Sequence, residues 1–136
     1  MSEDWIATNH QVVEEFRANG GRVKGRGPLV LLTIKGAKSG QPRVYPLMSV
    51  PYENGYLAVA SKGAAPENPQ WYYNLLAFPE ITVEVGKEAF PATARLLTGE
   101  ERQRAFAAAV VVFPRYGVYA TQTAREIPVF LLERMQ

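Results

Sequence analysis

Cysteine is absent from this chain of 136 residues, and histidine occurs once, at His10. The absence of cysteine excludes disulfides, thiolate nucleophiles and cysteine-ligated metals, and it fits a reducing compartment. With a single imidazole, a histidine-ligated metal site and a serine–histidine–aspartate triad are both disfavoured. We therefore expect no metal site and no hydrolytic triad.

Long apolar runs are also missing. No stretch reaches the roughly 18 uninterrupted apolar residues of a membrane span, and no signal-peptide pattern is present. We expect a single cytoplasmic domain over residues 1–136, which begins with a helix in residues 1–21. Peripheral membrane contact through that helix and the following Arg17, Arg22 and Lys24 is an alternative.

Acidic residues are absent from Phe16 to Tyr52, whereas this window holds seven basic residues. The rest of the chain has 15 − 7 = 8 basic and 13 acidic residues, a balance of −5. This polarised charge fits a multiply anionic ligand better than nucleic acid, whose binding proteins are usually basic over a whole face. A solvated basic hairpin tip is the alternative. The seven basic residues are Arg17, Arg22, Lys24, Arg26, Lys35, Lys38 and Arg43.

The segment 35–43 has the composition of an anion-binding turn. Gly36 and Gly40 permit a close approach of backbone N–H groups to an oxyanion. Lys38, Ser39 and Arg43 add donors and positive charge around them. We therefore expect an anionic group to bind at this turn.

Apolar spacing and turn signals predict strands that are mostly joined by hairpins, with helices at the start and in the connections. The first three strands are expected to pair in sequence, and Asn54-Gly55 is a hairpin signal. Thr8-x-x-Gln11 and Thr98-x-x-Glu101 are candidate capping boxes. The fold class expected is mainly β with helices (α+β), a six-stranded antiparallel barrel. The expected strands are 29–34, 43–50, 56–60, 81–85, 89–97 and 127–132, and the later helices are 70–77 and 98–112.

A second candidate site follows the third expected strand. Its residues Ser61-Lys62-Gly63-Ala64-Ala65 are mostly small, so a flat ligand can lie against the backbone. Trp71, in the helix that follows, offers an aromatic plane or edge. The alternative is an ordinary strand-to-helix loop with Trp71 in the core.

Together these motifs make the chain similar to the deazaflavin-dependent nitroreductase family of actinobacteria. The likeness covers nearly the whole chain, and it depends on the number, order and spacing of short motifs. They are Asn9-His10, Val13-x-x-Phe16-Arg17-x-x-Gly20-Gly21, Leu31-Leu32-Thr33, Lys38-Ser39-Gly40-x-Pro42-Arg43, Pro46-Leu47, Ala60-Ser61-Lys62-Gly63, Pro69-x-Trp71-Tyr72-x-Asn74-Leu75, Glu101-Arg102 and Thr123-x-Arg125-x-Ile127-Pro128.

The resemblance implies a split β-barrel of the flavin-reductase type that binds coenzyme F420, a deazaflavin with a phosphate and an oligoglutamate tail. It implies that Lys38, Ser39 and Arg43 hold the phosphate and begin the tail site. The implied ring site comprises Ser61, Lys62, Gly63, Ala64, Ala65, Trp71 and Asn74. Pro46 and Leu47 are further implied cofactor-binding residues. Ala64 departs from an expected glycine, and Tyr73 replaces a frequent histidine.

The resemblance further implies that residues 113–119 cover the acceptor pocket. Tyr116 and Tyr119 would stack on a planar acceptor or donate a hydrogen bond or proton, with Ser61 as a third candidate catalytic residue. The alternative is a structural role, in which both tyrosines pack a short helix onto the barrel.

The expected function is an F420H2-dependent reductase that transfers hydride to quinones, nitroaromatics or similar planar electrophiles. An FMN-dependent split-barrel oxidoreductase is an alternative, and a non-catalytic carrier of F420 or of an anionic lipid is another. The expected partner is a small-molecule acceptor and not nucleic acid, and the expected assembly is a monomer or a homodimer.

Overall fold

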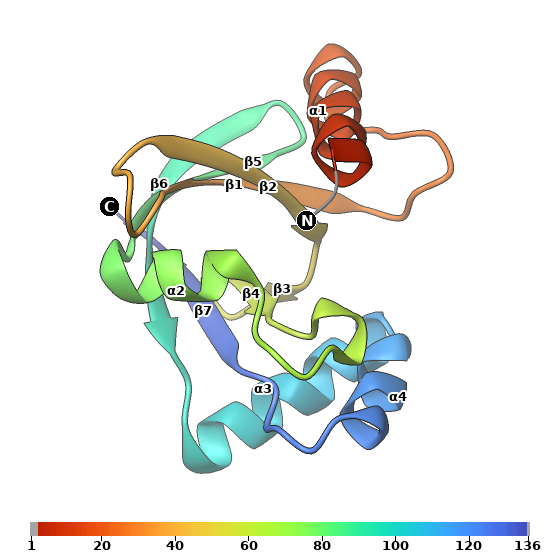
Figure 1. Ribbon diagram of the computed structural model, residues 1–136, viewed down its shortest axis with the longest axis vertical. Coiled ribbons are helices and arrows are strands. Elements are labelled where there is room, and N and C mark those ends of the chain that lie inside the picture. Colours follow the sequence, from red (N-terminus) through yellow and green to blue (C-terminus); the bar gives the residue numbers. More distant parts are fainter. Residues whose placement is uncertain (1–2, 136) are drawn as a thin grey trace.

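Seven strands form one antiparallel sheet in the computed structural model, which describes residues 3–135 and the side chains of residues 9–135 (Figure 1). The strands are β1 (Leu29–Lys35), β2 (Pro42–Met48), β3 (Pro51–Tyr52), β4 (Gly55–Val59), β5 (Glu80–Val85), β6 (Glu88–Leu96) and β7 (Val129–Arg134). The helices are α1 (Glu3–Ala18), α2 (Gln70–Ala77), α3 (Gly99–Val112) and α4 (Arg115–Gln122), and a short helical turn spans Lys62–Ala64.

The strand order β2-β1-β5-β6-β7-β4-β3 makes β2 and β3 the two edges of the sheet. These two strands are nevertheless separated in sequence by only Ser49 and Val50. The sheet therefore has to curl until its edges approach each other, and Figure 1 shows the resulting half-barrel. Pro42, Pro46 and Pro51 fit these edge strands, because a strand at an edge needs fewer backbone N–H donors.

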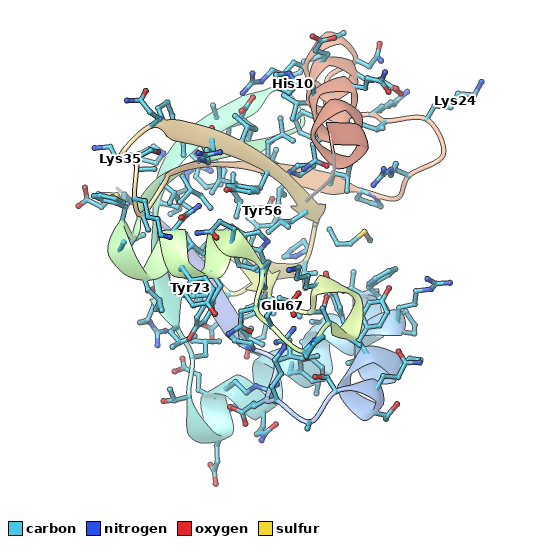
Figure 2. The ribbon with its side chains drawn as sticks, viewed as in Figure 1. His10, Lys24, Lys35, Tyr56, Glu67 and Tyr73 are labelled. Carbon is cyan, nitrogen blue, oxygen red and sulfur yellow. The ribbon has the colours of Figure 1, made fainter. Side chains whose placement is uncertain are left out.

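The loop between α1 and β1, residues 19–28, carries three exposed basic side chains. Figure 2 shows one of them, Lys24, pointing away from the rest of the protein. Gly21 lies so close to the β5–β6 turn that a Cβ atom on it would be 2.7 Å from the Cα of Gly86. This close approach requires glycine at position 21, and α1 ends before it at Ala18.

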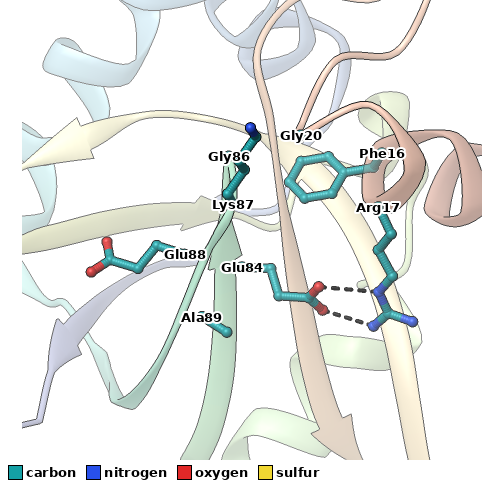
Figure 3. A pocket seen from close by; sticks show the side chains of 8 residues that line it. All are labelled: Phe16, Arg17, Gly20, Glu84, Gly86, Lys87, Glu88 and Ala89. Atoms are coloured by element: carbon teal, nitrogen blue, oxygen red, sulfur yellow. Dashed lines mark hydrogen bonds and ion pairs between the residues drawn. The ribbon is translucent and has the colours of Figure 1, made fainter.

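Helix α1 lies on the outer face of the sheet, near β2. Its side chains Val12 and Phe16 are buried and pack with Leu31 of β1. Arg17 forms a two-pronged ion pair with Glu84 of β5, with N–O distances of 2.7 and 3.0 Å (Figure 3). An apolar contact and an ion pair thus attach α1 to different strands.

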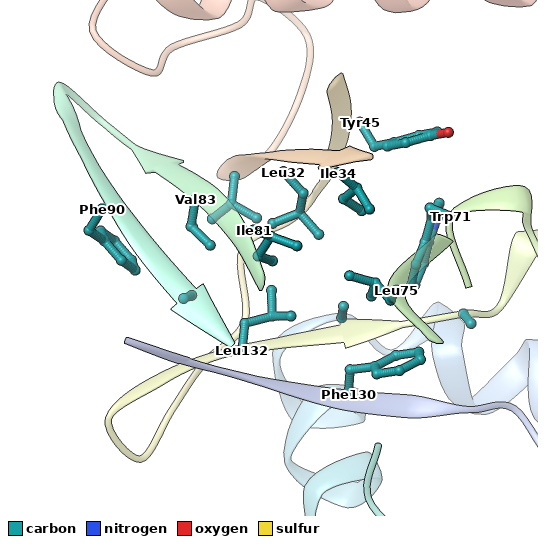
Figure 4. Close-up of a cluster of buried hydrophobic side chains, with 14 residues drawn as sticks. Leu32, Ile34, Tyr45, Trp71, Leu75, Ile81, Val83, Phe90, Phe130 and Leu132 are labelled. Carbon is teal, nitrogen blue, oxygen red and sulfur yellow. The ribbon is translucent and has the colours of Figure 1, made fainter. Parts of the chain in front are cut away.

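Apolar side chains of β1, β5, β6 and β7 fill the concave side of the curl (Figure 4). Leu32 and Leu132 are two of them, and α2 adds Trp71 and Leu75 from across the opening. The other face of β1 is buried against α1, and that of β7 is buried against α3 and α4. Burial on both faces explains why β1 has a continuous apolar run instead of an alternating pattern.

Two predictions about the sheet are wrong. The described residues form seven strands and not six, because β2 ends at Met48 and the two-residue β3 follows as a separate strand. The third expected strand, now β4, pairs with β7 and not with β2, so that Val59 lies opposite Val129. Pairing with β7 lets Leu57 enter the same buried cluster as Leu131.

Both predicted capping boxes are also wrong. Thr8 lies inside α1, which begins at Glu3. Thr98 does precede α3, but its side chain makes no capping hydrogen bond. The carboxylate of Glu101 accepts hydrogen bonds of 2.9 and 3.1 Å from Arg95 of β6, because a charged donor is a stronger partner than a backbone N–H group.

Several local predictions are confirmed. The Asn54-Gly55 signal lies in the hairpin between β3 and β4, and α2 occupies the expected residues between Pro69 and Pro79. Helix α3 ends at Val112, two residues before Pro114. Residues after Pro114 continue as α4, which corresponds to the short helix of the packing alternative.

Candidate functional site

The turn between β1 and β2 is built around two glycines. The N–H of Gly36 donates to the carbonyl of Gln41 at 2.9 Å, and the N–H of Gly40 donates to the carbonyl of Gly36 at 2.8 Å. Gly40 has a φ of +69°, and a Cβ on Gly36 would lie 2.7 Å from Ser39 Oγ. The backbone conformation therefore favours glycine at position 40, whereas a Cβ at position 36 would force the Ser39 side chain to move.

Two basic side chains at this turn, Lys38 and Arg43, are exposed. Among the side chains of residues 9–135, neither has an acidic partner within 4.0 Å. Arg17 differs from them, because Glu84 reaches it from β5. The expected concentration of unpaired positive charge is therefore found at the turn, where it suits an anion such as a phosphate.

Asn74 of α2 supports the turn from behind. Its side chain is 1% exposed; its Oδ1 accepts the N–H of Ala37 at 2.9 Å, and its Nδ2 donates to the Tyr45 hydroxyl at 3.0 Å. Burial raises the pKa of Tyr45, and the charge of Arg43 and the bond from Asn74 oppose that rise. That Asn74 frames a cofactor ring stays a prediction. Its two hydrogen bonds hold the turn 35–43 in position against α2 and β2.

The loop that follows β4 contains three consecutive residues with positive φ. They are Lys62, Gly63 and Ala64, with φ values of +46°, +59° and +68°. The N–H groups of Ala64 and Ala65 donate to the carbonyls of Ser61 and Lys62 at 3.0 and 3.1 Å. Residues with a Cβ rarely adopt this conformation, so the surrounding structure must hold the loop in place. The departure from glycine at Ala64 therefore falls at a position with a glycine-type conformation.

Lys62, a predicted cofactor ligand, lies 2.8 Å from the carboxylate of Glu67. The hydrogen bond and charge of Lys62 hold the pKa of Glu67 below its ordinary value. Both side chains are exposed, and exposed ion pairs contribute little to stability. The ammonium group can therefore exchange this partner for an anionic ligand at small cost.

Arg125, just before β7, is a residue whose role the sequence analysis missed. Its guanidinium donates hydrogen bonds to three backbone carbonyls and to the Asn68 side chain, all within residues 60–68. These partners lie 57 to 65 positions away in the sequence, so no local pattern could identify them. The motif around Arg125 was the sole signal in the sequence.

Helix α4 packs against the Lys62–Ala64 turn and carries both predicted tyrosines. Tyr116 is 6% exposed, and its ring meets that of Phe113 edge-on at a centroid distance of 4.9 Å. Burial, with a smaller contribution from Tyr119, raises the pKa of Tyr116 to about 12. These features favour the packing alternative for Tyr116, whereas Tyr119 keeps part of its surface exposed.

The other predicted cofactor-binding residues lie on β2 and α2. Trp71 is buried, and its ring centroid is 6.2 Å from that of Phe130, which favours the core alternative for this residue. Pro46 and Leu47 are half-buried on β2, and Leu47 packs against the concave-side cluster.

A groove of about 560 Å³ lies between α1, β2 and the start of α2. Arg43, Tyr45 and Gln70 line it from β2 and α2, and His10 lines it from α1. Its volume falls within the range of roughly 300–1,000 Å³ that is usual for small-molecule sites. The hollow drawn in Figure 3 lies between the end of α1 and the β5–β6 hairpin. It measures about 200 Å³, which is below this range. Another hollow, of about 660 Å³, is lined by Lys35 and Pro42 of the turn 35–43, but by none of the individual residues predicted to bind the cofactor.

Helix α2 links the separately predicted segments. Asn74 joins it to the turn 35–43, and the loop 61–69 leads directly into it. Helix α4 then packs against that loop. The structure thus connects these segments through α2, although it buries Trp71 and Tyr116. Of the predicted cofactor-binding and catalytic residues, Arg43 alone lines the groove.

Within residues 3–135, no group of three histidine, cysteine or acidic side chains has an arrangement that could hold a metal ion. The same part of the chain contains no helix long and apolar enough to cross a bilayer.

The protein family and the relatives to which this chain is similar have consistent descriptions. A sequence profile described as F420H(2)-dependent quinone reductase matches residues 5–134. An F420H(2)-dependent quinone reductase of Mycobacterium tuberculosis is 38% identical over 118 residues, which cover 85% of this chain and 79% of that protein.

Two solved structures are similar over most of the chain. An F420-H2 dependent reductase is 48% identical, with a TM-score of 0.73 over 78% of this chain and 94% of that one. A protein described as a domain-swapped dimer is 42% identical, with a TM-score of 0.76 over 96% of this chain and 98% of that one.

Proposed function

This chain belongs to the F420H(2)-dependent quinone reductase family, and we propose that it transfers hydride from reduced coenzyme F420 to quinones or similar planar acceptors. The observation that carries the proposal is the groove at Arg43. This groove adjoins a glycine turn with unpaired cations and extends to the start of α2. It therefore offers an anion site and an adjoining cleft of cofactor size.

The residues present fit the coenzyme. Lys38 and Arg43 supply charge for a phosphate and for the first carboxylates of a tail, and the backbone of the turn is already organised by Gly36 and Gly40. We assign the curled sheet to the split β-barrels of the F420-binding type, as one domain over residues 1–136. The near meeting of its two edge strands supports this assignment.

In this proposal, Lys38 and Arg43 donate charge-assisted hydrogen bonds to the phosphate. The Oγ of Ser39 accepts the N–H of Gln41 at 3.1 Å, which leaves its hydroxyl hydrogen to be donated to the ligand. Asn74 acts behind this set by fixing the backbone of Ala37.

We propose that the ring lies between β2, with Pro46 and Leu47, and the loop Ser61-Lys62-Gly63-Ala64-Ala65. None of these residues lines the groove, so the ring would lie beyond it. The backbone of that loop would supply hydrogen bonds, because its positive φ angles reorient successive peptide groups. Trp71 would support this region from the core rather than contact the ring, as its burial suggests.

Reduced F420, when bound, supplies the hydride, so the protein has to bind, orient and exclude water. Tyr119 and Ser61 are proposed to contact the acceptor, and Tyr116 to hold α4 in place through its contact with Phe113. The approach of α4 to the Lys62–Ala64 turn supports this division of roles.

The assembly stays a prediction of a monomer or a homodimer. The domain-swapped dimer described for a 42% identical protein supports the second. Light scattering of the purified protein distinguishes the two states.

Cytoplasmic localisation also stays a prediction, with peripheral membrane contact as the finer proposal. The buried side chains Val12 and Phe16 of α1 face the sheet, so they cannot insert into lipid while the helix is docked. The proposed contact therefore depends on the exposed charges of Arg22, Lys24 and Arg26 in the loop 19–28.

The test is titration of the purified protein with F420 and with FMN, followed by turnover of F420H2 with a simple quinone. We expect F420 to bind more tightly than FMN and the quinone to be reduced. Lys38→Ala or Arg43→Ala should weaken F420 binding by about ten- to a hundredfold, because each removes a charge-assisted bond to the phosphate.

Lys87→Ala is the matched control, because Lys87 is an exposed lysine in the β5–β6 turn and outside the groove. It should leave the affinity unchanged. Tighter binding of FMN, or binding of F420 without turnover, would replace the proposal with one of its two alternatives. Unchanged affinity in both turn variants would remove the turn from the site.

A further inference from the structure

The pairing of β4 with β7 places the loop that follows β4 beside the segment that precedes β7. Val59 lies opposite Val129, and one step further the N–H of Ala60 donates to the carbonyl of Pro128 at 2.9 Å. Because the strands are antiparallel, residues after Ala60 continue alongside residues before Pro128. This register brings Arg125 to the loop 61–65.

The guanidinium of Arg125 donates four of its five N–H groups to acceptors within residues 60–68. Nη2 donates to the carbonyl of Ser61 at 2.9 Å, and Nε donates to the carbonyl of Ala65 at 3.0 Å. Nη1 donates to the carbonyl of Ala60 at 3.1 Å and to Oδ1 of Asn68 at 2.8 Å. The bonds to Ser61 and Ala65 bracket the three residues with positive φ.

Those three residues need an external restraint. Lys62 and Ala64 carry a Cβ and have φ values of +46° and +68°, a conformation that side chains disfavour. The two backbone bonds within the turn are formed by residues of the loop itself. Arg125 ties both ends of the segment to a single rigid, part-buried group.

We propose that Arg125 is a positioning residue that fixes the loop 61–65 in the conformation that receives the cofactor ring. It acts through the backbone and without touching the cofactor. This inference rests on the proposed function, in which the loop frames the ring. Lysine cannot replace it, because an ammonium group has three donors at one point and lacks the planar fork.

The experiment compares Arg125→Gln and Arg125→Lys with the wild-type protein. F420 affinity is measured by fluorescence titration, and amide hydrogen exchange is measured in the protein without F420. Melting temperature and the kcat and KM for a quinone complete the set. We expect F420 to bind about ten- to a hundredfold more weakly, because binding must then also order the released loop. We also expect faster exchange confined to residues 61–68.

Arg102→Lys is the matched control. Arg102 is a buried arginine that, like Arg125, donates to a backbone carbonyl; its acceptor is Ile127, at 2.7 and 3.2 Å. Among the described side chains it makes no hydrogen bond to the loop 61–65, so its replacement should lower the melting temperature but leave F420 affinity and loop exchange unchanged.

Ala64→Gly tests the same restraint by relieving the backbone strain that Arg125 is proposed to oppose. Glycine accepts a positive φ without strain, so in the Arg125→Gln background it should restore about fivefold of the lost affinity. Such a recovery distinguishes positioning of the loop from a general loss of stability.

Equal effects of the Arg125 and Arg102 replacements on affinity would overturn the proposal, as would exchange that accelerates throughout the sheet. If Arg125→Gln fails to fold, Arg125→Lys gives the same comparison with the charge retained. Wild-type protein that binds no F420 would overturn the proposed function itself. Loop-confined exchange in the Arg125 variants would in that case still support the restraint.

Discussion

Tyr116 shows how burial determines the chemistry of a single residue. Its side chain is 6% exposed, and burial raises the pKa of its hydroxyl from 10.0 to about 12. The phenol therefore stays protonated over the whole physiological range. Such a group can donate a hydrogen bond, but it is a poor proton donor in a reaction, which agrees with its assignment to packing.

The shifted pKa predicts a loss of stability in alkali. Between pH 10 and pH 12, Tyr116 ionises in the unfolded chain but stays neutral in the folded protein, so the unfolded state is favoured as pH rises. Two pKa units correspond to a loss of about 3 kcal/mol in the free energy of unfolding, which is complete above pH 12. This loss is measured by denaturant unfolding of the wild type and of Tyr116→Phe at pH 9, 10, 11 and 12.

The difference between these two proteins should change only above pH 10, because phenylalanine has no proton to lose. Tyr119→Phe provides the control, since Tyr119 is less buried. A constant difference across the pH range would mean that Tyr116 ionises equally in both states.

At the scale of elements, α2 joins the anion-binding turn to the rest of the site. Asn74 occupies the middle of this helix and bonds to Ala37 on one side and to Tyr45 on the other. Because the side chains of Asn74 and Tyr45 are both buried, water cannot readily replace the bond between them. The position of the turn thus depends on a side chain that lies 37 residues after Ala37 in the sequence.

Asn74→Ala should lower the free energy of unfolding by about 1–3 kcal/mol, because it leaves the N–H of Ala37 without its partner. It should also weaken F420 binding about tenfold, since the turn loses its support. Thermal melting and F420 titration measure the two effects.

Tyr45→Phe is the control for Asn74→Ala. It removes the bond between Asn74 and the hydroxyl but keeps the bond to Ala37. The proposal for Asn74 would be contradicted by equal losses of affinity in the two variants.

At the scale of the whole molecule, the charge is distributed unevenly. The window from Phe16 to Tyr52 has seven basic residues and no acidic residue, and the remainder of the chain has a balance of −5. The fold places part of this window, the turn 35–43, beside the groove. The potential at the groove should therefore attract a multiply charged ligand more strongly than one with a single phosphate.

We expect the preference for F420 over FMN to shrink as salt is raised from 0.05 to about 0.5 M. Salt screens the attraction between the basic turn and the exposed carboxylates of the tail, whereas FMN has no such tail. Titrations of both cofactors over this range measure the ratio of their dissociation constants. A ratio that does not change with salt would mean that ring contacts alone set the preference.

The sequence by itself determined the local elements of this protein. Strand β1 follows from an apolar run that begins after Pro28, α2 follows from prolines at both ends, and the β3–β4 hairpin follows from Asn54-Gly55. These signals act within a few residues, where steric limits on φ and a missing N–H group decide the outcome. The family motifs around Lys38 and Ser61 could likewise be identified from the order of their residues in the sequence.

Only the tertiary structure decided which distant segments meet. It paired β4 with β7, joined Asn74 to Ala37, and brought Arg125 to a loop 60 residues away. Such contacts depend on which faces of a curled sheet are buried together, and no local spacing records that choice. The buried position of Tyr116 was decided in the same way, because aromatic side chains near a barrel opening look alike in sequence whether they pack or bind.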